Sequence, residues 1–172
     1  MRSVADFYQD CIAAVDQQPP LDVQLADAVS CVLAEDVRAP FNLPVADLAA
    51  CDGYAVRASD CSRAALDAPV TLPVTEEIRA GVVDPAALVP GTAIRIASGA
   101  PVPAGADAVV ALEFTDHGVA EVGVRSAPAV GENIRRRAED VAEGQVVLRS
   151  GARVGARQVA LLAGVGRSRV LV

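Results

Sequence analysis

Glycine and proline punctuate the middle of this sequence, and their spacing constrains the fold more than any other feature. Between residues 41 and 136, Gly or Pro interrupts short alternating or β-branched runs at intervals of roughly ten residues, which is typical of an all-β domain. Turn signals such as Val89-Pro90-Gly91 separate the runs. The runs that we expect to form strands are residues 70–74, 92–96, 108–113 and 119–125.

The two flanks show helical periodicity instead. The first flank carries one apolar stripe at helical spacing, which consists of Val4, Phe7, Tyr8, Cys11, Ile12 and Val15. Ser3 is a suitable N-cap for this helix, and Pro19 and Pro20 end it soon after Asp16. The remaining elements expected in the flanks are a short strand over residues 22–25, a helical segment over 25–33, a strand over 145–148, a helix over 156–163 with Gly164 as its C-cap, and a strand from 169.

This order predicts an α+β protein of two domains. Residues 1–40 and 137–172 would form one discontinuous mixed α/β domain, into which an all-β domain of residues 41–136 is inserted. Neither flank is long enough to bury the apolar stripe of its own helix, so we expect the flanks to pack on each other. Because aromatic residues make up 3% of the chain and Trp is absent, the cores must be aliphatic.

Charge excludes several classes of function. The net charge of −7 argues against binding to nucleic acid or to an anionic membrane. Every basic residue is Arg, and the absence of Lys excludes Schiff-base chemistry and a P-loop lysine. The only histidine, His117, follows Thr115 and Asp116 in a turn-like stretch, and we interpret it as an ordinary loop residue.

The cysteines at positions 11, 31, 51 and 61 form no C-x-x-C motif. We therefore expect neither a metal site nor a disulfide framework, but buried or half-buried thiols in a reducing compartment. No apolar run approaches the roughly 18 residues of a spanning helix, and residues 1–16 carry acidic and polar groups where a signal peptide would be apolar. These features predict a cytoplasmic protein.

Three segments carry residues suited to chemistry. The Asp52-Gly53 pair predicts either an ordinary turn or a carboxylate beside a close approach of the backbone. The stretch 95–107 delivers Ser98 into a Gly-Pro loop, which is either an anion site with free N–H groups or a rigid β-turn with no ligand. The triplet Arg135 to Arg137 could bind an oxyanion, or it could form ion pairs with Glu132, Glu139 and Asp140 that clamp the two domains together, and the sequence does not decide between these alternatives.

Together, these segments resemble one family in the same order and at similar spacing: the molybdopterin molybdenumtransferases, known as MoeA in bacteria and as the E domain of gephyrin. Residues 47–56 are similar to the family's D-N-S-A-M-D-G-Y-A-V. Residues 95–110 match R-I-x-T-G-A-P-V-P-x-G-A-D-A-V-V, with Ser98 for Thr. Residues 133–141 match N-I-R-R-x-G-E-D-I, with Ala138 for Gly.

The resemblance implies an elongated mixed α/β domain with an inserted β-barrel-like domain, and a homodimer. Family members insert molybdate into the dithiolene of adenylated molybdopterin, with Mg, in a cleft between the inserted domain of one subunit and a pterin-binding domain of the other. The residues at matching positions are Asp52, Ser98, Arg136 and Arg137 as catalytic candidates, Gly53, Gly99 and Arg135 as binding candidates, and Asp52 again as a candidate for Mg or molybdate.

Two departures limit what the resemblance implies. Leu48 and Ala49 replace the family's polar Asn-Ser pair, and the sequence stops at Val172, where the pterin-binding domain would begin. We therefore expect the chain to bind no cofactor by itself and to be inactive unless a separate pterin-binding domain or protein completes the cleft. Two alternatives remain: a dimerisation or scaffold module derived from the family, and an unrelated β-rich ligand-binding domain.

Overall fold

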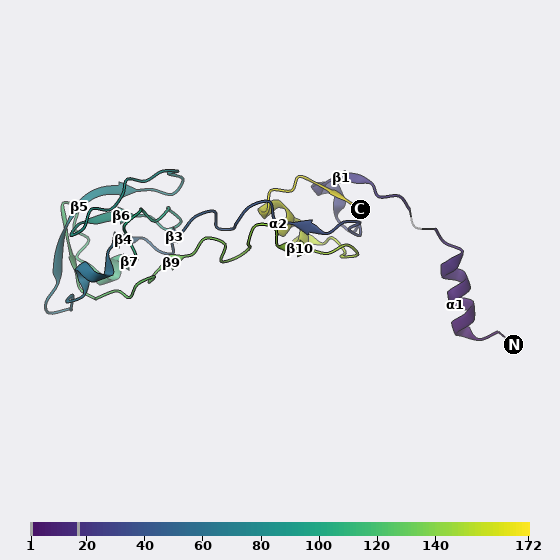
Figure 1. The fold of residues 1–172 in the computed structure, drawn as a ribbon, viewed down its shortest axis with the longest axis horizontal. Coiled ribbons are helices and arrows are strands. Elements are labelled where there is room, and N and C mark those ends of the chain that lie inside the picture. The colour runs from purple at the N-terminus through teal and green to yellow at the C-terminus, as the bar shows by residue number, and fades with distance from the viewer. Residues whose placement is uncertain (1, 17) are drawn as a thin grey trace. The chain divides into compact units, whose positions relative to one another are not determined.

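The protein is described by a computed structural model that covers residues 2–16 and 18–172 (Figure 1). The chain divides into two compact units, one formed by Met1–Arg38 with Val146–Val172 and the other by Ala39–Gln145. The fold is mixed α/β, and its largest element is a five-stranded sheet in the second unit. None of the helices among the described residues is long and apolar enough to span a membrane.

The first unit is held together by both ends of the chain. Strand β1 (Asp22–Gln24) pairs with β11 (Arg169–Leu171), and β2 (Val37–Arg38) pairs with β10 (Val146–Leu148), both antiparallel. Helix α2 (Ala156–Gly164) completes this small core. Its buried residues come from both flanks and are Ala28, Leu33, Val37, Val154, Leu162 and Val170. The expected packing of the two flanks is therefore confirmed for this core.

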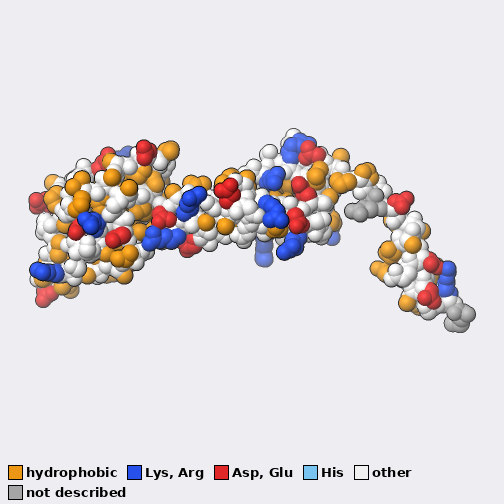
Figure 2. Space-filling model, in the orientation of Figure 1, with side chains coloured by type: hydrophobic (Ala, Val, Ile, Leu, Met, Phe, Trp, Pro, Cys, Tyr) orange, Lys and Arg blue, Asp and Glu red, His pale blue; other side chains and the backbone are white. Residues whose placement is uncertain are grey.

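Helix α1 (Val4–Ala13) forms where the periodicity predicts it, and Ser3 caps it as expected. The Asp6 N–H donates to Ser3 Oγ at 3.1 Å, and the Ser3 N–H donates back to Asp6 Oδ2. No residue of α1 is buried, however: Phe7 is 58% exposed and Tyr8 is 60% exposed. Figure 2 shows apolar side chains on the surface of this helix. The expectation that the flanks bury the apolar stripe is wrong, because α1 packs on neither flank.

Two further helix predictions need correction. Residues 25–33 do not form an α-helix: a short 3-10 helix over Leu25–Ala28 is followed by turns. Helix α2 is present, but Gly164 is its last residue rather than its C-cap. Gly166 takes the left-handed conformation instead, with φ 76°, and lies just beyond the C-cap residue Val165.

The second unit contains a five-stranded sheet in the order β7-β4-β6-β5-β8, in which only the β5–β6 pair is parallel (Figure 1). The strands are β4 (Gly53–Val56), β5 (Val70–Ile78), β6 (Ala93–Ile96), β7 (Ala108–Ala111) and β8 (Glu121–Val124). A separate antiparallel pair joins β3 (Leu48–Ala49) to β9 (Ile134–Arg135). Short 3-10 helices cover Ala58–Cys61 and Leu112–Phe114. Four of the five sheet strands were expected from the sequence.

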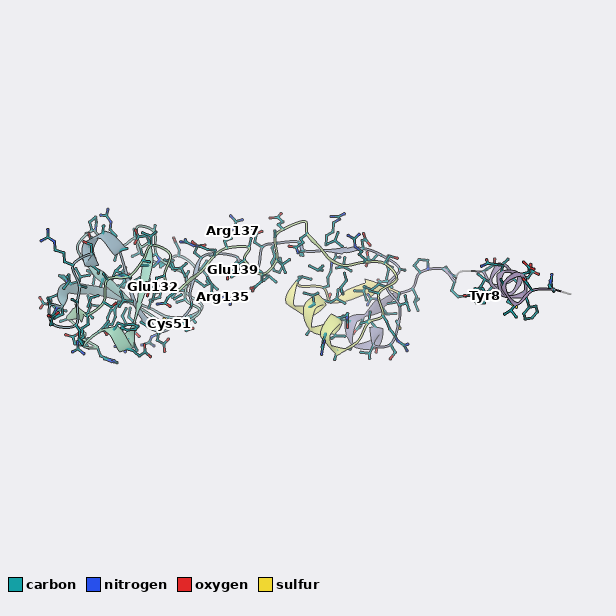
Figure 3. All side chains as sticks on the ribbon, turned by 90° about the horizontal axis from the view of Figure 1, so that it is seen from below. Tyr8, Cys51, Glu132, Arg135, Arg137 and Glu139 are labelled. Atoms are coloured by element: carbon teal, nitrogen blue, oxygen red, sulfur yellow. The ribbon has the colours of Figure 1, made fainter. Side chains whose placement is uncertain are left out.

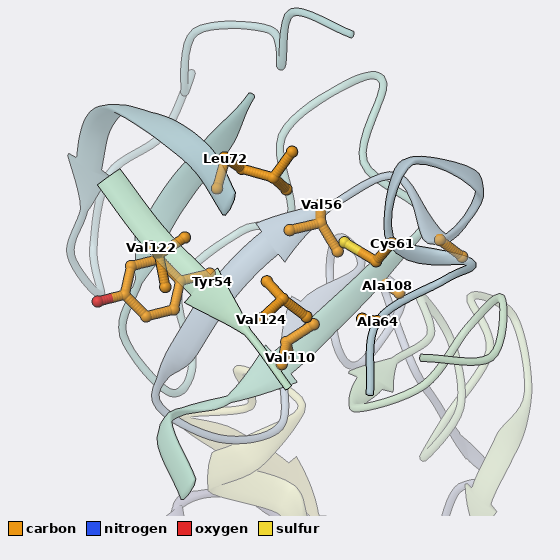
Figure 4. Packing of buried hydrophobic residues seen from close by; sticks show 11 residues of the cluster. Tyr54, Val56, Cys61, Ala64, Leu72, Ala108, Val110, Val122 and Val124 are labelled. Atoms are coloured by element: carbon orange, nitrogen blue, oxygen red, sulfur yellow. The ribbon is translucent and has the colours of Figure 1, made fainter. Parts of the chain in front are cut away.

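Aliphatic clusters cover both faces of this sheet, as the composition predicts. Tyr54, Val56 and Val124 belong to the cluster drawn in Figure 4, and Ala55, Ile94 and Val109 belong to a second cluster. Alternate residues of β4 thus enter different clusters, which is the two-residue period of a strand buried on both faces. Strand β4 is therefore an interior strand of the sheet, and all four of its residues are buried.

The Asp52-Gly53 turn expected from the sequence is only partly correct. A bend does occur at Cys51 and Asp52, but Gly53 begins β4. A Cβ atom on Gly53 would lie 2.1 Å from the Val110 carbonyl oxygen of β7. Glycine is required here because two strands approach closely, not because of a positive φ.

Candidate functional site

The structure brings Asp52 and Ser98 together. Gly53 of β4 lies opposite Ile96 of β6 in the antiparallel register, so the residues just before β4 and just after β6 meet at one end of the strand pair. The Ser98 N–H donates to Asp52 Oδ1 at 2.7 Å, and Ser98 Oγ donates to the Ala50 carbonyl at 3.3 Å. Two exposed polar side chains, 46 positions apart in the sequence, therefore share one site.

The loop that carries Ser98 does not offer the free N–H groups that the sequence suggested. The Ser98 N–H is bonded to Asp52, the Gly99 N–H donates to the Ala49 carbonyl at 2.8 Å, and the Ala100 N–H donates to the Ala97 carbonyl at 3.0 Å. Gly99 has φ 77° and supplies the left-handed residue of this turn. The expected anion cradle of loop N–H groups is therefore wrong: these donors hold the loop and Asp52 in place.

A pocket of about 150 Å³ opens beside Asp52. Asp52, Glu77 and Arg95 supply its ionisable side chains, and the remaining lining comes from Gly53, Ile96, Ala97 and Leu112. Sequence reasoning missed Glu77 and Arg95 as site residues. The sequence offered one signal for Arg95, its position at the start of the 95–107 stretch that contains Ser98. The strand register that places Arg95 in the pocket cannot be read from the sequence.

Two residues of the arginine triplet form ion pairs with carboxylates of the same unit. Arg135 Nη2 lies 2.6 Å from Asp140 Oδ2, and Arg136 Nη1 lies 2.7 Å from Asp47 Oδ2. The Arg137 guanidinium has neither a hydrogen bond nor an ion pair with any residue that the structure describes. Figure 3 shows Arg135 and Arg137 on opposite sides of the ribbon. Both ion pairs lie within one unit, so they are not the clamp between the two domains that the sequence suggested, and of the expected partners only Asp140 takes part.

Asp47 is the anchor of this arrangement. It accepts the Arg137 N–H at Oδ1 over 2.7 Å, as well as the Arg136 side chain at Oδ2. The hydrogen bond from the Arg137 backbone, together with the Arg136 side chain, outweighs partial burial and lowers the pKa of Asp47. Glu139, which the sequence offered as an ion-pair partner, accepts the Arg136 N–H at 2.7 Å instead.

The four cysteines are free thiols, and the pKa is raised for two of them. Burial raises the pKa of Cys51, and the nearby carboxylates of Glu113, Asp52 and Glu132 raise it further. Burial also raises the pKa of Cys61 to about 11. Cys11 is exposed, which corrects the expectation that all four thiols are buried or half-buried.

His117 takes part in a loop and not in the site. Its N–H donates to Thr115 Oγ1 at 3.2 Å, and its φ of 60° is that of a left-handed turn residue. No group of three or more His, Cys, Asp or Glu side chains suited to a metal ion occurs among the described residues. Asp52 could therefore serve a Mg ion only as one ligand among others, as is usual where substrate phosphates complete the coordination.

Comparison with known proteins identifies the family. The family model for the MoeA N-terminal region, domains I and II, matches residues 2–166. Molybdopterin molybdenumtransferase 2 of Mycobacterium tuberculosis H37Rv is 46% identical over 180 residues, which cover 100% of this chain and 44% of that protein. The Bacillus subtilis molybdopterin molybdenumtransferase is 40% identical over 125 residues, which cover 70% of this chain and 29% of that protein.

Solved structures agree with this match. The chain superimposes on a crystal structure of a molybdopterin biosynthesis MoeA protein from Pyrococcus horikoshii with a TM-score of 0.86 and 38% identity, over 91% of this chain and 41% of that one. The chain thus spans less than half the length of the relatives that it matches. By sequence and by fold, it belongs to the molybdopterin molybdenumtransferase family of molybdenum cofactor biosynthesis, and it corresponds to the family's N-terminal region.

Proposed function

We propose that the unit formed by Ala39–Gln145 supplies one wall of the site at which molybdate is inserted into adenylated molybdopterin. The observation that carries this proposal is the contact between Asp52 and Ser98 at the edge of a small polar pocket. The relatives are molybdopterin molybdenumtransferases. The same two residues stand at the positions where the family motifs place Asp and Thr.

Asp52 is the group best placed to act on a substrate. One of its oxygens is fixed by the Ser98 N–H, and Oδ2 forms no hydrogen bond with a described residue. A carboxylate held in this way keeps one oxygen available to accept a proton or to bind a cation that accompanies the substrate. Ser98 acts as the positioning residue, because its N–H orients Asp52 and its hydroxyl is tied to the Ala50 carbonyl.

The pterin-binding part of the cleft lies outside this pocket. Sites for drug-sized ligands enclose roughly 300–1,000 Å³, whereas the pocket beside Asp52 encloses about 150 Å³. Adenylated molybdopterin is far larger than molybdate, so we expect residues 1–172 alone not to bind it tightly and to be inactive alone. A pterin-binding domain or protein would complete the cleft, in a homodimer as the family resemblance implies. Calorimetric detection of tight pterin binding by this chain would contradict this part of the proposal.

The test is complementation of a strain that lacks molybdate transfer, with a separate pterin-binding domain supplied. We expect rescue by the unchanged chain and loss of rescue with Asp52→Asn, which keeps the size of the side chain and removes its charge. Asp67→Asn is the matched control, because Asp67 is exposed and does not line the pocket. Rescue by Asp52→Asn at the level of the unchanged chain would refute the enzymatic proposal.

Two observations favour the second candidate function, a scaffold or dimerisation module. Arg135 and Arg136 are engaged by carboxylates of the same unit, and Leu48 and Ala49 replace polar residues of the family motif. A scaffold predicts rescue that does not depend on Asp52. The same complementation assay therefore separates the two functions.

A further inference from the structure

Arg95 is a half-buried arginine whose guanidinium has neither a hydrogen bond nor an ion pair with any part of the chain that the structure describes. Its charge does reach Tyr54: burial raises the pKa of that phenol, and Arg95 opposes the increase. None of its nitrogen atoms is fully buried, so the unpaired guanidinium is open to a ligand in the pocket. The guanidinium has five N–H donors, so it is suited to a ligand that supplies hydrogen-bond acceptors.

The strand register places this arginine in the site. Arg95 of β6 lies opposite Tyr54 of β4 on one side and opposite Glu77 of β5 on the other. Residues in register on neighbouring strands share a face of the sheet, so these three side chains form a row across it. Arg95 and Glu77 line the same pocket as Asp52, and they also line a second pocket of about 230 Å³ beside it.

The size and chemistry of the first pocket narrow the choice of ligand. The share of one water molecule in the liquid is about 30 Å³, so about 150 Å³ accommodates a small inorganic ion but not a pterin. The guanidinium is the only positively charged group in the lining, and its planar fork matches the spacing of oxyanion oxygens. The carboxylates of Asp52 and Glu77 lie in the same lining and weaken the hold on any anion.

Of the other anion binders that the sequence suggested, only the Arg137 guanidinium has no partner among the described residues, and it does not line this pocket. The N–H groups of Ser98, Gly99 and Ala100 are used within the chain. Arg135 and Arg136 are paired with Asp140 and Asp47. We propose that Arg95 is the oxyanion-binding residue of this site and that it holds a tetrahedral oxyanion, molybdate, beside Asp52. The choice of molybdate among oxyanions rests on the proposed function, whereas the oxyanion site itself rests on the geometry.

Calorimetric titration of the full chain with sodium molybdate, at fixed ionic strength, tests this proposal. We expect Arg95→Gln to weaken molybdate binding at least tenfold, and Arg95→Lys to be intermediate because the charge remains but the fork is lost. Arg63→Gln is the matched control, because Arg63 is exposed and lies outside the pocket lining. Its affinity should equal that of the unchanged chain.

A second variant keeps the test decisive if Arg95→Gln does not fold. Glu77→Gln removes a negative charge from the same lining at an exposed position, so it should tighten molybdate binding several-fold. Two results would overturn the proposal: no molybdate binding by the unchanged chain, or binding that is lost with Arg136→Gln and kept with both Arg95→Gln and Glu77→Gln.

Failure of this inference can be told from failure of the proposed function. Complementation that needs Asp52 but tolerates Arg95→Gln would refute the role of Arg95 and leave the molybdate-transfer function standing. Molybdate binding that depends on Arg95, in a chain that never rescues transfer, would refute the proposed function and leave the oxyanion site standing.

Discussion

Gly53 shows how one residue without a side chain determines both the sheet and the site. It begins β4, directly after Asp52, and faces the β7 backbone at the Val110 carbonyl. We predict that Gly53→Ala destabilises the protein by about 3 kcal/mol, because a Cβ 2.1 Å from a backbone oxygen forces the strands apart. Urea unfolding followed by circular dichroism measures this change.

Gly164→Ala is the matched control for that substitution. Nothing lies within 4 Å of a Cβ atom at Gly164, and this residue is the last of α2. Because glycine weakens helices, Ala should stabilise the protein here by roughly 0.5–1 kcal/mol. Equal destabilisation by the two substitutions would contradict the close-approach explanation for Gly53.

Asp47 gives the protein a specific response to acid. Its pKa is lowered in the folded state, first by the Arg137 N–H and then by the Arg136 side chain. A carboxyl group with a lowered folded pKa stabilises the fold above its unfolded pKa, and this stability is lost as pH falls through the folded value. We predict that Asp47→Asn lowers the free energy of unfolding at pH 7 and that the difference from the unchanged chain disappears below the usual carboxyl pKa of 3.8.

Urea titrations at pH 7 and at successively lower pH values test this prediction. Asp67→Asn serves as the control, because the Asp67 carboxylate is exposed and has no hydrogen bond in the described chain. A difference for Asp47→Asn that stays constant down to pH 2 would show that the side chain acts through shape and not through charge.

At the scale of the elements, the sequence predicts those strands and helices that are determined by nearby residues, such as turn formers and helix caps. Strands β5, β6, β7 and β8 were expected because Gly and Pro bound their β-branched runs, and α1 was expected from its period and its cap. Strand β4 was missed because Asp-Gly is usual in turns, and because Tyr54, Ala55 and Val56 are all buried and show no alternation. Arg95 was missed as a site residue because long-range pairing decides the register of β4, β6 and β5.

Helices α1 and α2 have the same periodicity but different energetic roles. Since α1 buries none of its residues, removal of residues 1–16 should leave the free energy of unfolding of the remaining chain unchanged within about 0.5 kcal/mol. Leu162→Ala in α2 removes a side chain that is 0% exposed and should cost about 2–5 kcal/mol. Chemical denaturation of the two variants measures both values, and a large loss on removing α1 would show that its apolar face is covered in solution.

At the scale of the whole molecule, the first unit is built from two separate segments of the chain and the second from one continuous segment. The core of the first unit needs both ends of the chain, because Leu33 and Val37 pack with Val154 and Leu162. The second unit is continuous and contains all five strands of its sheet and both of its apolar clusters. Its own ends meet: the Ala39 N–H donates to the Gln145 carbonyl at 2.9 Å, and the Gly144 N–H donates to the Ala39 carbonyl at 2.8 Å.

We therefore predict that residues 39–145 fold without the rest of the chain, whereas residues 1–38 alone do not. A continuous segment that has its own cores and adjoining ends should lose little stability when the flanks are removed. Dispersed amide resonances and a cooperative thermal transition for residues 39–145 would confirm this. The fragment also contains Asp52, Ser98 and Arg95, so it should bind molybdate with the affinity of the full chain. A folded fragment with weaker binding would show that the first unit contributes to the oxyanion site, and an unfolded fragment would contradict the independence of the sheet.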